Sequence, residues 1–250
     1  WPAYELRVRR NVDLVLELME SNGIHGTFFI LAWIAEREPQ MVRQIADAGH
    51  EIASHGCMHD RVTTLTPAQF AQDIRHSKSL LEDLSGQQVI GYRAPSYSIN
   101  HTNQWAFPEL REAGYLYSSS IFPGRHDLYG MPGAPRFPYR PLDDGLLEIP
   151  ITTVEVAGRR LSCGGGGFFR LWPYPLYRRL LERVNAHDGR PAIFYMHPWE
   201  VDPEQPRISE ASLRSRFRHY LNLKQVVPRL QRLLTDFSWD RMDRVFGLRG

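Results

Sequence analysis

The sequence has few cysteines, no long apolar run and no excess of charge of either sign. Cys57 and Cys163 are its only cysteines and no basic-then-apolar leader opens it, so the expected compartment is a reducing cytoplasm. The longest wholly apolar run, residues 28–35, is less than half of the roughly 20 residues that a membrane-spanning helix needs. A net charge of +2, from 30 basic and 28 acidic residues, is too balanced for nucleic-acid binding by phosphate neutralisation. We therefore expect neither a membrane span nor a nucleic-acid partner.

The composition is that of a globular protein. Hydrophobic residues make up 42% of the chain and charged residues 23%, which excludes disordered, collagenous and coiled-coil classes. A length of 250 residues is near the upper end of what one hydrophobic core supports. No internal repeat is present, and we interpret residues 1–250 as a single domain.

The apolar pattern alternates between helical and strand periods. It predicts helices over residues 4–22, 39–49, 66–85, 103–113, 175–186 and 223–237. It predicts strands over residues 26–31, 51–54, 89–92, 115–121, 146–151 and 193–196, with a long proline-rich loop over 123–141. Short connections between alternating helices and strands favour an α/β fold with parallel strands.

Two histidines follow the predicted strand at residues 51–54. His55 and His59 are four residues apart, and on a helical turn this spacing places two imidazoles on one face, where both could bind one metal ion. Taken alone, such a pair is more often two surface or capping side chains. Its position favours metal binding, because α/β barrels carry their catalytic residues after the carboxyl ends of parallel strands.

Two further polar residues follow predicted strands. His197 comes after residues 193–196 and could act as a general acid, and Arg93 comes after residues 89–92 and could bind a carboxylate through two N–H groups. A core histidine with a satisfied hydrogen bond and a surface arginine are the alternatives when each is taken alone.

The order of these segments resembles that of the polysaccharide deacetylases, the NodB-like members of carbohydrate esterase family 4. The motifs are Thr27-Phe28-Phe29, Ser54-His55-Gly56-Cys57-Met58-His59, Arg93-Ala94-Pro95 and Tyr195-Met196-His197. Residues 117–123, 125–132, 148–150, 165–170 and 197–206 resemble the branch found beside bacterial exopolysaccharide and exosortase genes. The resemblance implies a distorted (β/α) barrel with fewer than eight parallel strands. It also implies a divalent metal, with zinc expected, and removal of N-acetyl groups from a glycan in exopolysaccharide biosynthesis.

Roles for individual residues follow from the resemblance. His55 and His59 would be metal ligands, Arg93 would orient the catalytic carboxylate, and His197 would be the general acid that protonates the leaving amine. Contacts to the N-acetylated glycan are expected from Pro95, Ser96, Tyr97, Phe168, Arg170 and Trp199.

The sequence departs from the family pattern in two places. The family carries its base aspartate and a third, aspartate metal ligand on a strand before the first helix. Asp13 lies on that predicted helix, so we expect both aspartates upstream of Trp1 and only weak metal binding by residues 1–250 alone. At Ser96 the family more often has a tyrosine whose backbone N–H binds the oxyanion, and a serine backbone can keep that role.

Two other segments have alternative interpretations. The glycine run at residues 163–167 is not followed by the Gly-Lys-Ser/Thr of a phosphate-binding loop. The aromatic residues beside it could stack on sugars or pack beneath a loop. His126 and Asp127, in the proline-rich loop, could contact the site or form a turn.

Two other functions remain open alternatives. The first is a cyclic-amide hydrolase like the allantoinases, which can dispense with the metal, and the second is a glycan-binding protein without catalysis. The residues of the 125–127 stretch favour the glycan interpretation, and bound zinc would distinguish the two enzymes. The glycan, the N-acetyl sugar and the oligomeric state are open at this stage.

Overall fold

The chain divides into two compact units. The computed structural model describes residues 5–126, 129–143, 145–208 and 211–248. His25–Thr153 with Asp240–Gly250 form one unit, here called the sheet unit, and Trp1–Ile24 with Val154–Trp239 form the other, the helix unit. We keep, as a proposal, the interpretation of residues 1–250 as one domain.

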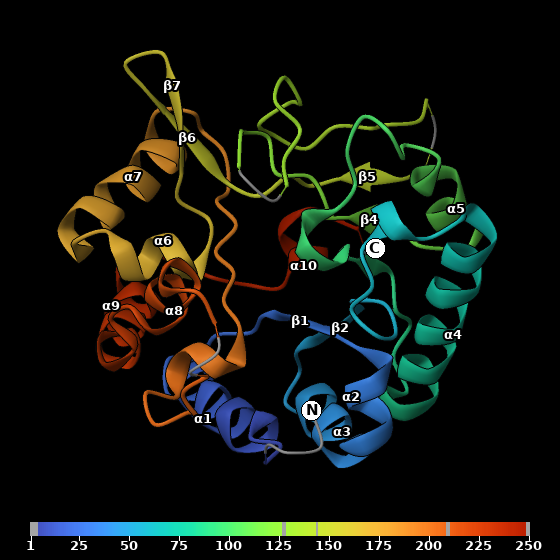
Figure 1. Cartoon of the computed structure of the whole chain (residues 1–250), viewed down its shortest axis with the longest axis horizontal. Coiled ribbons are helices and arrows are strands. Elements are labelled where there is room, and N and C mark those ends of the chain that lie inside the picture. The colour runs from blue at the N-terminus through green and yellow to red at the C-terminus, as the bar shows by residue number, and fades with distance from the viewer. Residues whose placement is uncertain (1–4, 127–128, 144, 209–210, 249–250) are drawn as a thin grey trace. The chain divides into compact units, whose positions relative to one another are not determined.

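The sheet unit is built on five short parallel strands. They are β1 (Thr27–Ile30), β2 (Glu51–Ser54), β3 (Gly91–Tyr92), β4 (Tyr117–Ser118) and β5 (Leu147–Glu148). Each strand pairs in parallel with the next one along the chain (Figure 1). Parallel neighbours in strict chain order are the arrangement of (β/α) barrels, so the predicted α/β fold with fewer than eight parallel strands is confirmed.

Strand β3 is shorter than the predicted strand over residues 89–92. Two side chains of helix α4 (Pro67–Ser85) form hydrogen bonds with the backbone of Val89. The carboxylate of Glu82 accepts its N–H at 2.9 Å, and the ammonium of Lys78 donates to its carbonyl. The Val89 N–H is therefore not available to the ladder, and β3 begins only at Gly91.

Helices cover the sheet between successive strands. They are α2 (Ala32–Arg37), α3 (Pro39–Asp47), α4 and α5 (Ala106–Glu112), with the short α10 (Met242–Val245) from the end of the chain. Helix α4 begins with a capping box, in which the Thr66 hydroxyl accepts the Gln69 N–H and the Gln69 amide oxygen accepts the Thr66 N–H. The helix ends at Gly86, whose φ of 66° gives the left-handed cap.

The core of the sheet unit lies between β2 and the helices packed on it. Ile52 and Ala53 of β2 are fully buried, as are Phe70, Ile74 and Leu81 of α4. These apolar contacts fix the strands and hence the positions of the residues that follow them.

The helix unit contains most of the remaining elements. They are α1 (Val8–Glu20), β7 (Arg159–Ser162), α6 (Gly166–Leu171), α7 (Tyr174–Ala186), η3 (Pro198–Val201), α8 (Leu213–Tyr220), η4 (Leu223–Gln225) and α9 (Val226–Asp236). Strand β6 (Thr153–Val156) begins at the boundary and pairs with β7. Over the ranges described, every helix is too short or too polar to traverse a lipid bilayer.

In this unit, one predicted strand is absent and one hairpin was not predicted. Residues 193–196 do not form a strand, because Tyr195 makes only an isolated parallel bridge to Gly165 and the chain at Gly166 turns at once into α6. The hairpin of β6 and β7 was not predicted. Its turn residues Ala157 and Gly158 both have positive φ, 50° and 71°, as a tight two-residue hairpin turn requires.

Candidate active site

Three polar residues lie directly after three neighbouring strands. His55 follows β2, Arg93 follows β3 and Ser119 follows β4. The backbone N–H of each donates to a carbonyl oxygen of the preceding strand in the sheet, at 2.9 Å in all three cases. The parallel ladder therefore continues by one residue and aligns the three at the carboxyl edge of the sheet.

The imidazole of His55 has a defined tautomer. Its Nδ1 lies 2.7 Å from the carbonyl oxygen of Arg93. Because a carbonyl oxygen can only accept, Nδ1 must carry the proton, and in the neutral ring the lone pair is on Nε2. This is the arrangement by which proteins prepare a histidine for binding a metal.

The ring of His59 lies beside that of His55. The two ring centroids are 5.2 Å apart and the rings are nearly perpendicular, at 71°. The predicted helical turn is wrong, because Gly56 and His59 have left-handed backbones with φ of 78° and 65°, and residues 55–60 form an irregular loop. The two imidazoles are close because of this loop and not because of a helical repeat.

The loop that carries both histidines is held by α2 and α4. The first N–H groups of α2, from Ala32 and Trp33, donate to the carbonyl oxygens of Gly56 and Cys57. Asp73 of α4 accepts the Cys57 N–H at 3.0 Å. Burial, with Asp73 nearby, raises the pKa of the Cys57 thiol to about 12, so this cysteine is protonated at neutral pH and is no nucleophile.

Arg93 is buried and not a surface arginine. Its Nε donates to the carbonyl oxygen of Ser119 at 3.1 Å and its Nη2 to the Ser119 hydroxyl at 3.0 Å. The guanidinium carbon lies 4.0 Å from the centre of the Phe29 ring and 5.8 Å from that of Tyr97. Two hydrogen bonds and two aromatic rings thus fix a positive charge at the edge of the sheet.

Glu148, at the end of β5, supports this edge. One carboxylate oxygen accepts the N–H groups of Ser120 and Ile121, at 2.9 and 2.8 Å, and the other is buried with no hydrogen-bond partner among the residues described. Burial raises the pKa of Glu148 to about 7, and the Ser118 hydroxyl, the two N–H groups and Arg93 lower it only in part. Since Ser120 also accepts the N–H of Ala94, Glu148 braces the segment that holds Arg93.

The predicted contact residues Pro95, Ser96 and Tyr97 form a strained turn, η2 (Pro95–Tyr97). Ser96 and Tyr97 both have left-handed backbones, with φ of 55° and 49°. Such backbone strain costs roughly 1–3 kcal/mol per residue and is typical of functional sites. Pro95 and Tyr97 are buried, so Ser96 is the most exposed of the three.

An aromatic cluster continues from this turn into the proline-rich loop. The ring of Tyr129 lies 5.6 Å from that of Tyr97, and His126 stacks on Tyr129 at 4.0 Å. The stacking gives His126 a defined place beside Tyr97. Asp127 lies outside the described residues.

In the helix unit, His197 is held by a buried carboxylate. Its Nδ1 and its backbone N–H both lie 3.0 Å from the same oxygen of Glu200, while half of its side-chain surface is exposed. Burial alone would raise the pKa of Glu200, but the hydrogen bonds and charges of His197 and Arg170 outweigh it and lower that pKa. The ionised Glu200 therefore orients the His197 ring.

Arg170 is buried behind this pair. It donates to Glu200 at 2.9 Å and to the carbonyl oxygens of His219 and Leu221 at 2.8 and 3.0 Å. These contacts hold Arg170 behind Glu200, and its contact with the glycan stays a prediction. Within the glycine run, position 166 has no room for a side chain, because a Cβ atom on Gly166 would lie 2.2 Å from the Glu200 carboxylate.

The other predicted contacts of the helix unit are aromatic. Trp199 stacks between His197 and His219, with ring centroids 5.5 and 4.1 Å away. Phe168 lies on α6 and is partly exposed.

The structure thus forms two clusters from the predicted residues. His55, His59, Arg93 and the turn at Ser96 lie together in the sheet unit, and His197, Arg170 and Trp199 lie together in the helix unit. No group of three potential metal ligands is present within the described ranges. Convergence of His197 with the histidine pair stays a prediction.

Three supporting residues were not predicted. Ser119, Glu148 and Glu200 each bind a predicted site residue or its neighbour. The sequence could have identified Glu148, because it is an acidic residue within an apolar predicted strand and a buried carboxylate is rarely found without a partner.

The parallel sheet, with its histidines and arginine at the carboxyl edge, places the protein among the α/β-barrel proteins. Residues 4–117 match the family model described as polysaccharide deacetylase, and residues 119–247 match the one described as domain of unknown function (DUF3473). The chain thus belongs to the family of the second model, which covers just over half of it, and residues 4–117 carry a polysaccharide deacetylase domain of the carbohydrate esterase family 4 type.

Curated relatives match over part of the chain. A peptidoglycan deacetylase-like protein of Gibberella zeae is 34% identical over 115 residues, which are 45% of this chain and 33% of that protein. A peptidoglycan deacetylase of Helicobacter pylori is 30% identical over 111 residues, which are 44% of this chain and 36% of that protein. The matched segment thus spans about a third of the length of these relatives.

Solved structures share the fold over nearly the whole chain. A family 4 carbohydrate esterase of Streptomyces lividans has a TM-score of 0.52 at 16% identity, covering 92% of this chain and 83% of its own. An allantoinase has a TM-score of 0.61 at 19% identity, covering 94% of this chain and 70% of its own. At these identities the likeness concerns the fold alone.

Proposed function

We propose that the protein is a metal-dependent enzyme that removes N-acetyl groups from a glycan. The observation that carries this proposal is the histidine pair, in which the Arg93 carbonyl fixes the His55 tautomer while the His59 ring lies 5.2 Å away. The names of the curated relatives support a glycan as the substrate.

The residues of the pair fit a zinc ion. Zinc binds neutral imidazole nitrogens, and the hydrogen bond at Nδ1 leaves the lone pair of His55 on Nε2. Catalytic zinc sites have about three protein ligands, and the family resemblance assigns the remaining one to an aspartate. A bound zinc ion would polarise the acetamide carbonyl and lower the pKa of water.

The residues of this chain would act around the acetamide. Arg93 provides a fixed positive charge that orients a carboxylate base, and Ser96 offers its backbone N–H to the developing oxyanion. His197, oriented by Glu200, donates a proton to the leaving amine nitrogen. A role in exopolysaccharide biosynthesis is proposed from the resemblance of five segments between residues 117 and 206 to that branch of the family.

Release of acetate from N-acetylglucosamine oligosaccharides tests the proposal. Replacement His197→Ala is expected to lower kcat by roughly 10²–10⁴-fold, as loss of a general acid does. His187→Ala is the matched control, since His187 is an exposed histidine of the same unit, and it should keep full activity.

Three outcomes would overturn the proposal. Wild-type turnover by His197→Ala would remove the assigned acid. Hydrolysis of allantoin without release of acetate from any N-acetylated oligosaccharide would favour the cyclic-amide alternative. Oligosaccharide binding without either reaction would favour a catalytically silent protein.

A further inference from the structure

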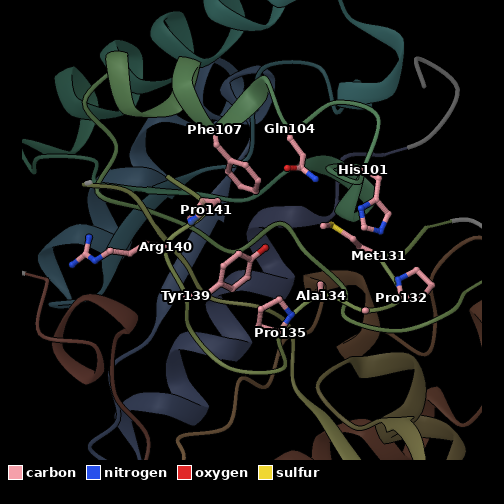
Figure 2. Close-up of a pocket in the computed structure, with 11 residues that line it drawn as sticks. His101, Gln104, Phe107, Met131, Pro132, Ala134, Pro135, Tyr139, Arg140 and Pro141 are labelled. Carbon is pink, nitrogen blue, oxygen red and sulfur yellow. The ribbon is translucent and has the colours of Figure 1, made fainter. Parts of the chain in front are cut away.

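Two features of the described residues take no part in the proposed reaction. One is a cavity of about 350 Å³ in the sheet unit, which Figure 2 shows among Gln104, Met131 and Tyr139. Phe107 in its wall is only 2% exposed and belongs to the core, so we assign this cavity no ligand. The other feature is the outer face of α8 in the helix unit, where two large apolar side chains are exposed to solvent.

The outer face of α8 is apolar. Leu213 is 81% exposed and Phe217 is 61% exposed, which makes them the two most exposed large hydrophobic residues in the part of the chain that the structure describes. They are four residues apart, so both side chains lie on one side of the helix. We call these two residues the α8 stripe. A third exposed apolar residue, Ile208, is held beside the same helix, because its N–H donates to the Tyr220 hydroxyl at 2.9 Å.

The other side of α8 attaches the helix to its unit. The His219 ring stacks on that of Trp199, with 4.1 Å between the centroids, and the His219 carbonyl oxygen accepts an N–H of Arg170 at 2.8 Å. None of the described residues of α8 is buried. The apolar residues of an ordinary surface helix face the core, whereas the α8 stripe faces away from it.

Arginines flank the stripe. Successive residues of an α-helix are about 100° apart, so Arg214 and Arg218 lie on one flank and Arg216 lies on the other. Residues 207–224 contain five basic residues and one acidic residue. The helix unit contains 17 basic and 12 acidic residues, whereas the sheet unit contains 13 basic and 16 acidic residues. The positive charge of the chain is therefore concentrated in the unit that exposes the stripe.

An anionic lipid surface matches this pattern. A helix that lies in a membrane interface places apolar side chains at the acyl boundary and basic side chains among the headgroups. Arginines near an anionic surface add electrostatic attraction to this burial. A second copy of the chain fits less well, because a two-fold contact through the stripe would bring the flanking arginines of both copies together.

We propose that α8 docks the protein on an anionic lipid surface. Leu213 and Phe217 insert at the acyl boundary, and Arg214, Arg216 and Arg218 contact the headgroups. Such a helix lies in the interface without spanning the bilayer. The inference does not depend on the proposed deacetylation, and it adds that the protein acts at a membrane surface.

Co-sedimentation with lipid vesicles tests the proposal. The full chain should bind vesicles that contain phosphatidylglycerol at least about tenfold more tightly than vesicles of phosphatidylcholine alone, and added salt should weaken the binding. Leu213→Ser combined with Phe217→Ser should lower the affinity for the anionic vesicles by about tenfold or more. Leu116→Ser combined with Val245→Ser, which changes two exposed apolar residues of the sheet unit, is the matched control and should bind as the wild type does. No preference for anionic vesicles, or wild-type affinity without the stripe, would overturn the proposal.

The arginines are tested separately from the stripe. Arg214→Gln combined with Arg218→Gln should lower the affinity for anionic vesicles by about tenfold or more, since each basic residue near such a surface contributes about fivefold. Arg43→Gln combined with Arg75→Gln removes the same charge at exposed positions of α3 and α4 and should leave the affinity unchanged. Equal losses in the two pairs would show that only net charge matters, which would overturn the assignment to α8.

Two further measurements distinguish a lipid surface from other partners. Phe217→Trp keeps a large apolar ring and should retain binding to anionic vesicles, whereas loss of binding would overturn the insertion of this side chain. A dimer in solution that becomes a monomer when both stripe residues are changed to serine would assign the stripe to a second copy and overturn the proposal. Tighter binding to a soluble acidic polysaccharide than to anionic vesicles, unchanged in the same variant, would overturn it in favour of a glycan.

Discussion

The Nδ1 atom of His55 lies 2.7 Å from the carbonyl oxygen of Arg93, so the residue after β3 sets the tautomer of the residue after β2. Arg93 in turn binds Ser119, the residue after β4, through its guanidinium. Each strand end therefore positions its neighbour, and the metal-binding geometry that we propose depends on the order of the strands.

Replacing Arg93 tests how strongly this edge depends on its side chain. Arg93→Lys removes the planar group that binds Ser119 twice and stacks on Phe29. We expect unfolding free energy to fall by roughly 2–4 kcal/mol, because hydrogen bonds of a buried charge are lost. Denaturant unfolding measures this, and Arg75→Lys, at an exposed position of α4, should stay within about 0.5 kcal/mol of the wild type. Equal stability of the two variants would show that Arg93 is not a fixed element of the site.

Glu148 should make the stability of the protein depend on pH. Its pKa is raised from 4.5 to about 7 by burial, so the folded state holds this proton more tightly than the unfolded state. Below pH 4.5 this carboxyl group has no effect on the unfolding free energy. As pH rises from 4.5 to 7, the raised pKa lowers the unfolding free energy by roughly 3 kcal/mol in total, and above pH 7 the loss is complete.

The variant Glu148→Gln should lack this loss of stability between pH 4.5 and 7, since an amide oxygen can still accept the N–H groups of Ser120 and Ile121. Glu112→Gln, at an exposed position of α5, should retain the wild-type profile. Thermal unfolding across this pH range measures the difference. Parallel profiles for wild type and Glu148→Gln would contradict the raised pKa.

Gly56 should be required by the histidine loop for two separate reasons. Its φ is 78°, and a Cβ atom there would lie 2.8 Å from the Asp73 carboxylate. We expect Gly56→Ala to destabilise the protein by roughly 2–4 kcal/mol, from backbone strain and displacement of Asp73 together.

Two control variants separate these causes. Gly23→Ala has a φ of 64° but open space around the added methyl, so it should cost only the strain, roughly 1–2 kcal/mol. Gly167→Ala has neither problem and lies in α6, so it should be neutral or slightly stabilising. Equal stabilities of Gly56→Ala and Gly23→Ala would show that the contact with Asp73 has no energetic effect.

Local signals in the sequence predicted the elements that local physics determines. The helix predicted over residues 66–85 is α4, whose two ends are set by the capping box at Thr66 and the left-handed cap at Gly86. The placement of His55 and Arg93 after strands followed from apolar runs that end in polar residues. These features need only neighbours in the chain.

Features that depend on distant contacts were not predictable. The single bridge of Tyr195 depends on the turn at Gly165, and the truncation of β3 depends on side chains of α4. The fixed tautomer of His55 depends on a carbonyl group 38 residues away. Spacing alone suggested a helical turn, whereas an irregular loop brings the two rings together.

Zinc binding by variants of the two histidines tests the central claim most directly. Calorimetric titration of the chain should show weak zinc binding at a single site, with affinity lowered further, by at least tenfold, in His55→Ala and in His59→Ala, because each removes a ligand. His76→Ala, at an exposed histidine of α4, should bind zinc as the wild type does. Wild-type affinity in both His55→Ala and His59→Ala would contradict the account and place any metal elsewhere.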